Sequence, residues 1–337
     1  MKFAILGAGR MGRRHIHAVR KLGFSVWGVV DRSQSSLDEV KQEFHLNEKM
    51  LFVTPDEMFA AGVPDCLIIA TTADSHCELT CMAAERGVKH ILVEKPLAVS
   101  LEECDQMIRT CEQHGTRLSV NHQMRFMNQY SKPKELLDSE LYGGFKSMTV
   151  VGGNFGFSMN GSHYLEAFRF LSGEDPVEVT AWFDPGAVTN PRGPKFEDRA
   201  GSIRVSTASG KRLYIEIGSE QGHGLEVIYT GRNGLIAVSE LDGRMTATIR
   251  KSEFLELPTT RYGMPADTTH VTITPAEVID STALVLNALI NDDNRVMAEQ
   301  GMKAVEVLVA AYESAENNNR PVKIGNNLDR SRVFPWA

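Results

Sequence analysis

Three glycines near the beginning of the sequence have the spacing of a turn that binds a nucleotide pyrophosphate. Gly7, Gly9 and Gly12 form the pattern Gly-x-Gly-x-x-Gly directly after a short apolar run. In such a turn the first glycine permits a tight bend, the second lets phosphate approach the backbone, and the third lets helix pack closely on strand. A helix is expected to follow the glycines, and the backbone of the turn, which includes Arg10 and Met11, would present free N–H groups to the phosphates together with the N-terminus of that helix. We expect all five residues to contact a dinucleotide; the alternative is a turn with structural glycines only.

An acidic residue stands where recognition of the adenosine ribose requires one. Asp31 lies 19 residues beyond Gly12, close to the offset of about 20 residues that is typical of a dinucleotide fold. A carboxylate there accepts hydrogen bonds from both ribose hydroxyls and repels a 2′-phosphate, which favours NAD over NADP. Arg32 is the opposing signal, because an arginine at this place can accommodate that phosphate. The sequence predicts NAD as cofactor, with NADP as the alternative.

Two further side chains, Lys95 and His163, are of the types that handle protons and developing negative charge. Lys95 directly follows a predicted buried strand, and Thr71 and Thr72 follow another. Open α/β sheets bind ligands outside the carboxyl ends of their strands, so these residues fall at the edge where a cofactor would lie. Taken alone, Lys95 fits a solvated loop and His163 fits a core or a helix cap.

The elements that position the first group alternate between strand and helix. Short apolar runs predict strands, and amphipathic segments between them predict helices. The predicted strands cover residues 3–6, 24–30, 66–70, 90–93 and 117–120. The first predicted helix lies past the glycines and ends near residue 22, and the others cover residues 35–44, 56–61, 75–86 and 101–114. This alternation predicts a Rossmann domain, a doubly wound parallel sheet, over residues 1–121.

The pattern changes in residues 122–337, which are predicted to form a second domain that binds substrate and mediates oligomerisation. Strands are expected at 145–155, 177–183, 202–207, 212–217, 225–229, 235–238 and 245–250, and helices at 130–139, 164–171, 276–290 and 296–315, with Pro133 in the first turn of one. Hairpin-type turns between the strands predict an α+β domain built on a large, mostly antiparallel sheet. Helices would cover one face of this sheet. Burial of the other face in a homodimer or homotetramer follows as an expectation.

Composition and charge narrow the class of partner. The 337 residues carry a formal net charge of −7 and no dense basic patch, which argues against nucleic acid or an anionic membrane as a partner. No apolar run approaches the roughly 18 residues of a membrane-spanning helix. The five cysteines include no Cys-x-x-Cys pair, so a reducing, cytoplasmic setting is expected.

Four short motifs, taken in order, resemble the glucose-fructose oxidoreductase / inositol dehydrogenase / MocA family, and the resemblance covers most of the chain. The motifs are Ile69-Ala70-Thr71-Thr72-Ala73-Asp74-Ser75-His76, Val93-Glu94-Lys95-Pro96, Asn121-His122-Gln123-Met124-Arg125-Phe126 and Gly161-Ser162-His163-Tyr164-Leu165-Glu166. Ala73 stands where the family typically has proline. The set of four is far more specific than any one of them.

The resemblance implies hydride transfer between C4 of the nicotinamide and a secondary alcohol of a sugar, a cyclitol or a sugar derivative. In this interpretation His163 is the acid/base and Lys95 hydrogen-bonds the reacting oxygen. A cis peptide before Pro96 is also implied. The resemblance adds Thr71, Thr72, His76, Glu94 and Lys95 to the cofactor contacts. Candidate substrate contacts are His122, Arg125, Asn154, Asn160 and Tyr164, while the loops at 190–199 and 259–269 are expected to be exposed.

One departure from the family pattern leaves alternatives open. Many members carry an aspartate four residues before the histidine, and this sequence has Met159 there. Asn160 or Glu166 would have to compensate, or His163 would act alone, or the protein would bind its ligand without turning it over. A non-catalytic NAD-binding sensor or regulator is therefore one rival function, and an NADPH-dependent carbonyl or imine reductase is another. His163 and Glu166 do not gain further ligands from the sequence, so no metal site is predicted.

Overall fold

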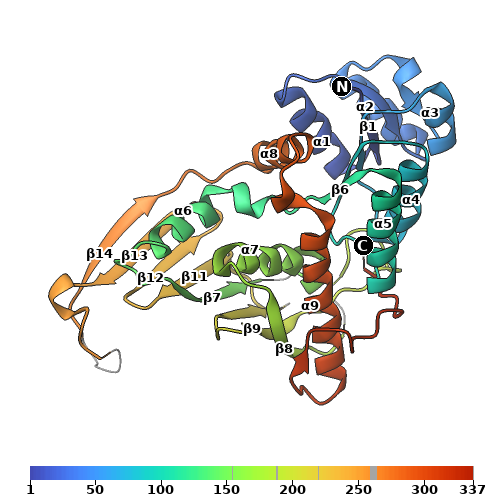
Figure 1. Ribbon diagram of the computed structural model, residues 1–337. Helices are drawn as coiled ribbons and strands as arrows, with labels where there is room; N and C mark the ends of the chain where they lie inside the picture. The colour runs from blue at the N-terminus through green and yellow to red at the C-terminus, as the bar shows by residue number, and fades with distance from the viewer. Residues whose placement is uncertain (154, 187–188, 219, 259–263, 337) are drawn as a thin grey trace. The chain divides into compact units, whose positions relative to one another are not determined.

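The computed structural model describes residues 1–153, 155–186, 189–218, 220–258 and 264–336 (Figure 1). The chain forms two compact units. The first contains Met1–Gln123, Glu277–Val305 and the last residues from Asp329 onward, and the second contains Met124–Ala276 and Glu306–Leu328. None of the described helices is both long and apolar enough to cross a membrane.

The first unit is built on a six-stranded parallel sheet in the order β3-β2-β1-β4-β5-β6. Its strands are β1 (Phe3–Leu6), β2 (Val26–Val30), β3 (Leu51–Phe52), β4 (Cys66–Ile69), β5 (His90–Val93) and β6 (Arg117–Val120). The central strands are apolar along their whole length and fully buried, as expected of a sheet covered by helices on both faces. The predicted Rossmann fold is confirmed.

Six helices flank this sheet in the described part of the first unit. They are α1 (Arg10–Lys21), α2 (Gln34–Phe44), α3 (Pro55–Ala61), α4 (His76–Glu85), α5 (Leu101–His114) and α8 (Val278–Ile290). The sequence-based boundary placed all of residues 122–337 in the second domain, whereas α8 lies in the first unit. The reason is packing: Val285, Leu286 and Leu289 are fully buried, and the helix contacts α1, where Lys21 Nζ lies 2.5 Å from Asp280 Oδ1.

The second unit is built on a nine-stranded sheet in the order β14-β13-β12-β11-β7-β10-β9-β8-β15. Its strands are β7 (Phe145–Gly152), β8 (Pro176–Phe183), β9 (Gly201–Thr207), β10 (Arg212–Ile217), β11 (Glu226–Gly231), β12 (Gly234–Ser239), β13 (Arg244–Arg250), β14 (Ala266–Thr272) and β15 (Val322–Lys323). Every neighbouring pair is antiparallel except β7 and β10. The predicted large, mostly antiparallel sheet is confirmed.

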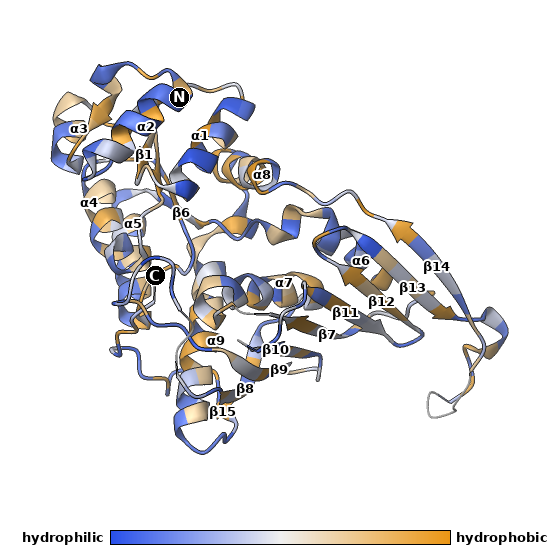
Figure 2. Ribbon diagram, turned by 180° about the vertical axis from the view of Figure 1, so that it is seen from behind, coloured by the Kyte–Doolittle hydropathy of each residue, from blue (hydrophilic) through white to orange (hydrophobic). Residues whose placement is uncertain are grey.

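Helices cover one face of the nine-stranded sheet. They are α6 (Asn128–Leu137), α7 (Ser162–Ser172) and the second half of α9 (Ala298–Glu316) (Figure 1). Along β10 the residues Leu213, Ile215 and Ile217 are buried and alternate with Tyr214 and its polar neighbours. Apolar and polar residues accordingly interleave along the strands of this sheet (Figure 2).

The structure differs from several sequence-based expectations in this unit. The helix expected at 130–139 begins at Asn128, so Pro133 lies in its second turn and not its first. The strand expected at 145–155 ends at Gly152. Of the loop expected at 259–269, residues 259–263 lie outside the described residues, and residues 266–269 belong to the edge strand β14, which is exposed along its whole length and has no apolar pattern. The loop expected to be exposed at 190–199 buries Phe196 and Asp198.

Candidate active site

The candidate cofactor residues of the first unit lie along one edge of its sheet. Leu6 pairs with Ile69, Ile69 with Val93, and Val93 with Val120, so β1, β4, β5 and β6 end side by side. Gly7, Thr71, Lys95 and His122 each lie within two residues of the end of one of these strands. The strand order reverses between β1 and β4, and the crevice at such a switch point is where open α/β sheets bind their ligands.

The glycine-rich turn has a separate physical reason for each glycine. Gly7 has φ +98°, and a Cβ there would lie 2.7 Å from Ala70 O. A Cβ on Gly12 would lie 1.8 Å from Gly7 O, whereas a Cβ on Gly9 would point into open space. That open space lies at the N-terminus of α1, where Gly9 is the N-cap, no side chain caps the helix, and Arg10 is exposed. The turn therefore fits a pyrophosphate.

Asp31 closes the turn from the end of β2. Its Oδ2 accepts a hydrogen bond from Ala8 N at 2.7 Å, and its Oδ1 accepts one from Ser33 N at 2.8 Å. The carboxylate is half-buried and keeps free lone pairs for ribose hydroxyls. Arg32 next to it is exposed. The arrangement fits the ribose of NAD, with Arg32 near enough in sequence to contact a 2′-phosphate.

The loop after β4 holds Thr71, Thr72 and His76 in different ways. Thr71 and Thr72 are half-buried, and their hydroxyls contact Ser75 and Asp74 of the same loop. His76 is fully buried, with Nδ1 at 3.0 Å from Pro96 O and Nε2 at 3.3 Å from Thr71 O. Burial lowers the pKa of His76 although these carbonyls oppose it, so the ring is neutral and donates to the nearer Pro96 carbonyl. It braces the loop, and its role as a cofactor contact stays a prediction.

Lys95 stands directly after β5 at the same sheet edge, and 9% of its surface is exposed. The peptide bond between Lys95 and Pro96 is cis, as the family resemblance implies. Glu94, the residue between β5 and Lys95, is 4% exposed and contacts His15 and Asn121. His122 is buried, and its N–H donates to Val120 O.

The second unit carries His163 as the second residue of α7, where it is 8% exposed. A π-helical turn, Phe157–Gly161, leads into this helix, and Gly161 N donates to Gly156 O. Asn160 of this turn is exposed, and Asn154 lies outside the described residues. Lys95 and His163 belong to different compact units, and their pairing stays a prediction.

Asp198 fixes the turn that precedes His163, and sequence reasoning missed it. Its Oδ1 accepts from Ser158 N and its Oδ2 from Met159 N, at 2.9 and 2.8 Å. Arg199 N also donates to Oδ1, at 2.9 Å. Burial raises the pKa of Asp198 although these backbone N–H groups oppose the rise. The carboxylate thus lies against the backbone of Met159, the position where the family pattern has an acid.

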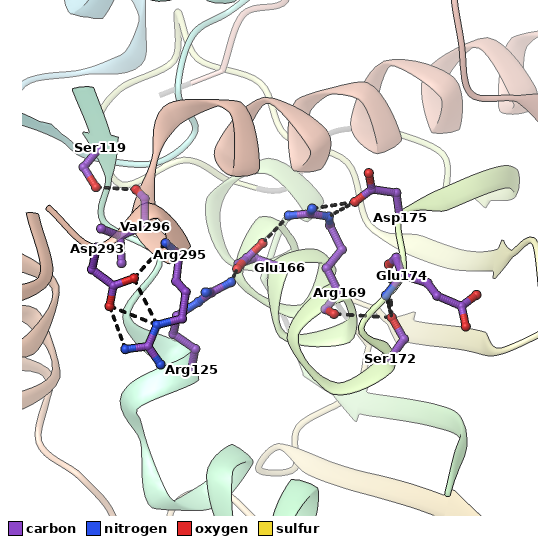
Figure 3. A network of polar contacts seen from close by, with 10 residues as sticks. All are labelled: Ser119, Arg125, Glu166, Arg169, Ser172, Glu174, Asp175, Asp293, Arg295 and Val296. Atoms are coloured by element: carbon purple, nitrogen blue, oxygen red, sulfur yellow. Dashed lines mark hydrogen bonds and ion pairs between the residues drawn. The ribbon is translucent and has the colours of Figure 1, made fainter. Parts of the chain in front are cut away.

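Glu166 cannot serve the role of that missing acid. It is 2% exposed, its Oε1 accepts from Arg125, and its Oε2 accepts from Arg169 Nη1 at 2.9 Å (Figure 3). Arg169 continues to Asp175, with Nε at 2.9 Å from Asp175 Oδ1. Arg125 thereby ties the segment before α6 to α7, and both it and Glu166 are used structurally. Among the described residues no group of three or more potential ligands is arranged to hold a metal ion.

Tyr164 faces the core of the second unit. It is 1% exposed, and its hydroxyl donates to Glu240 Oε2 at 2.7 Å. Tyr130 of α6 donates to the other oxygen of Glu240. Burial raises the pKa of Glu240 although both tyrosines oppose it. This cluster anchors α6 and α7 to the end of β12, and Tyr164 has no exposed hydroxyl to offer a substrate.

Comparison with known proteins agrees with the geometry. Residues 1–122 match the model of an oxidoreductase family with an NAD-binding Rossmann fold, and residues 152–324 match the model of the α/β C-terminal domain of that family. Among curated relatives, a 2,7-anhydro-N-acetylneuraminate hydratase from Mediterraneibacter gnavus is 28% identical over 225 residues, covering 59% of this chain and 58% of the relative. A myo-inositol 2-dehydrogenase from Thermotoga maritima is 23% identical over 196 residues, covering 54% and 58%. The chain therefore aligns with just over half the length of these relatives.

A solved structure shows the same fold over nearly the whole chain. An oxidoreductase from Agrobacterium radiobacter, in complex with NAD+, L-tartaric acid and magnesium, superposes with a TM-score of 0.80 at 22% identity, covering 96% of this chain and 98% of that one. The chain belongs to the glucose-fructose oxidoreductase / inositol dehydrogenase / MocA family of oxidoreductases, with an NAD-binding Rossmann domain and the α/β C-terminal domain of that family.

Proposed function

We propose that this protein is an NAD-dependent oxidoreductase that moves a hydride between the nicotinamide and a secondary alcohol of a sugar, a cyclitol or a sugar derivative. The observation that carries the proposal is the sheet edge, where the glycine turn and Asp31 fit a dinucleotide and Lys95 directly follows a neighbouring strand. Relatives named as myo-inositol 2-dehydrogenase and D-apiose dehydrogenase support the class of substrate.

In the proposed mechanism Lys95 and His163 handle the alcohol. Bound NAD supplies the hydride acceptor. The Lys95 ammonium donates a hydrogen bond to the reacting oxygen and stabilises the negative charge that develops there. His163 takes the hydroxyl proton as the carbon–hydrogen bond breaks, which contributes on the order of 10²–10⁴-fold to the rate. In the opposite direction His163 returns this proton to the oxygen.

Two carboxylates of the second unit, Glu166 and Asp198, have partners of their own. Glu166 accepts hydrogen bonds from two arginines, and Asp198 accepts hydrogen bonds from backbone N–H groups. We therefore propose that Asp198 holds the turn that precedes His163, in which Met159 stands where the family pattern has an acid.

A turnover screen tests this function. The purified protein is offered NAD with a panel of free and nucleotide-linked sugars and cyclitols, and reduction is followed by nicotinamide absorbance. We expect turnover with at least one polyol and its loss in Lys95→Ala and His163→Ala. Turnover that survives both substitutions would refute the site. Tight NADH binding without turnover on the whole panel would favour a regulator, and a preference for NADPH with carbonyl or imine substrates would favour a reductase.

We further propose a homodimer or homotetramer formed through the face of the nine-stranded sheet opposite α6 and α7. Trp182 and Tyr214 lie on that face and are 49% and 37% exposed. Their neighbours in the register include Ser202, Glu216 and Arg204. Analytical ultracentrifugation of Tyr214→Glu tests this, with a shift toward monomer expected.

All five cysteines are buried and none forms a disulfide bond in the described structure, which supports the proposal of a reducing, cytoplasmic setting.

A further inference from the structure

Three buried polar side chains, those of His15, Glu94 and Asn121, form a hydrogen-bonded cluster that contacts the backbone of Lys95 through Glu94. His15 Nε2 lies 2.8 Å from Glu94 Oε1, and Asn121 Nδ2 donates to the same oxygen at 2.8 Å. His15 and Asn121 are 0% exposed and Glu94 is 4% exposed. The three residues come from α1, from the end of β5 and from the end of β6. None of them has a role in the proposed transfer of hydride and proton.

Glu94 is ionised in this environment. Burial alone would raise its pKa, but the hydrogen bond and charge of His15, the charge of Lys95 and the hydrogen bond from Asn121 together lower it. Its second oxygen, Oε2, accepts a hydrogen bond from the backbone N–H of Lys95 at 3.4 Å. The carboxylate is thus held on one side by His15 and Asn121 and on the other by the backbone of Lys95.

The packing around His15 indicates that the polar cluster of His15, Glu94 and Asn121 is not needed for stability alone. The neighbours of His15 on the buried face of α1, Ile16 and Val19, are apolar and fully buried. A buried carboxylate and its hydrogen-bond donors gain little over well-packed apolar side chains, because the loss of hydration offsets their attraction. Such a group is better suited to fix one geometry than to add stability, and here it joins two functional segments.

Those segments are the helix of the dinucleotide turn and the turn that carries the catalytic lysine. His15 lies three residues after Gly12, in the helix whose N-terminus fits the pyrophosphate. We infer that His15 and Asn121 are positioning residues, which act through Glu94 to fix the backbone of Lys95 relative to the cofactor-binding helix. The inference rests on the proposed function only where it gives Lys95 a catalytic role.

Substitution of His15 tests the inference with activity as the first readout. His15→Ala removes the donor to Glu94, and we expect kcat to fall by about 10- to 100-fold, the effect of a small displacement of a catalytic group. In His15→Gln the side-chain amide reaches toward the same carboxylate, and kcat should recover to within roughly threefold of the unsubstituted protein. The dissociation constant for NADH, measured by fluorescence, should change by less than about threefold in both. His17→Ala is the matched control, since its side chain lies on the same helix and is 48% exposed.

Hydrogen–deuterium exchange of peptides covering residues 90–100, with NADH bound, gives a readout that does not depend on turnover. We expect faster exchange in His15→Ala than in the unsubstituted protein, and restored protection in His15→Gln. Asn121→Ala removes the second donor to Glu94 and should show the same direction of change if His15→Ala does not fold. Unchanged kcat together with unchanged exchange in these variants would overturn the inference. Failure of the proposed function is a different result, namely no turnover by the unsubstituted protein.

Discussion

Replacement of Asp198 tests how the turn before His163 is held. Asp198→Ala leaves three backbone N–H groups without their acceptor, the buried one of Ser158 and the part-buried ones of Met159 and Arg199. Each unsatisfied donor costs about 1–3 kcal/mol. The low end of that range applies, because the substitution also removes the cost of burying a carboxylate. The free energy of unfolding should therefore fall by about 3 kcal/mol.

Asp198→Asn distinguishes the contributions of the two carboxylate oxygens of Asp198. An asparagine with its carbonyl at the Oδ1 position still accepts from Ser158 and Arg199, but its amide faces the N–H of Met159. One donor is lost instead of three, so we expect a cost of about 1 kcal/mol. Gly156→Ala attacks the same contact from the other side, because its Cβ would lie 1.9 Å from Asp198 Oδ2. Gly222→Ala is the matched control, since a Cβ there meets open space.

Urea unfolding followed by circular dichroism measures these differences, with kcat and KM determined on the same samples. The expected order of stability is unsubstituted protein and Gly222→Ala, then Asp198→Asn, then Asp198→Ala and Gly156→Ala. The turnover of the last two should fall more than their KM rises, because the turn leads into the helix that carries His163. Equal stability of Asp198→Ala and the unsubstituted protein would refute the reasoning.

Three further outcomes follow from the described contacts. Asp31→Ser should raise the Kd for NADH by roughly 10- to 100-fold, because the hydrogen bonds to a charged acceptor are lost. Fluorescence titration should also show tighter binding of NADPH, beside the exposed Arg32. An unchanged preference between NADH and NADPH would contradict the role of Asp31. The folded pKa of Glu94 is lowered, so its ionised form stabilises the protein above its unfolded pKa of about 4.3, and this stability is lost as the pH falls through the folded value. The difference in free energy of unfolding between the unsubstituted protein and Glu94→Gln should therefore narrow as the pH falls below about 4.3, and a difference that widens there would contradict the lowered pKa. Arg125→Ala should lower the free energy of unfolding by only about 2 kcal/mol, because Glu166 keeps Arg169 as its partner. Differential scanning calorimetry should show this loss of stability while KM changes little. A large rise in KM would instead make Arg125 a substrate contact.

The first unit was predictable from local patterns. The apolar runs that become β1 and β4 are fully buried, so each reads as a continuous apolar segment. The strands β5 and β6 are buried except at their first residues, His90 and Arg117. The glycine spacing carries its own steric reason at each position. The Rossmann fold, the cofactor turn and the place of Lys95 at the sheet edge therefore follow from the sequence with little dependence on distant residues.

The missed features depend on partners distant in the sequence. Asp198 lies about 40 residues after the turn that it holds, in a segment rich in proline, glycine and charge that is typical of an exposed loop. His15 and Glu94 are 79 residues apart, and an isolated histidine on an apolar helix face gives no sign of its partner. Amphipathic α8 likewise shows which face is buried but not against which unit it packs.

Tyr164 and Glu166 show the same limit at the second site. Their spacing from His163 places them on the same helix, but the sequence does not show that Glu240 takes the hydroxyl of Tyr164 or that Arg125 and Arg169 take the carboxylate of Glu166. Tyr164 was therefore proposed as a substrate contact and Glu166 as a substitute for the missing acid, whereas the structure gives both side chains partners inside the second unit.

The most direct test of the central claim is the turnover of the Lys95→Ala/His163→Ala double variant with NAD and an accepted polyol, compared with both single variants. If the two residues act together on one oxygen and its proton, their substitutions should be strongly non-additive. The turnover of the double variant should then lie within a few-fold of that of the slower single variant. Single variants that turn over as fast as the unsubstituted protein would contradict the account.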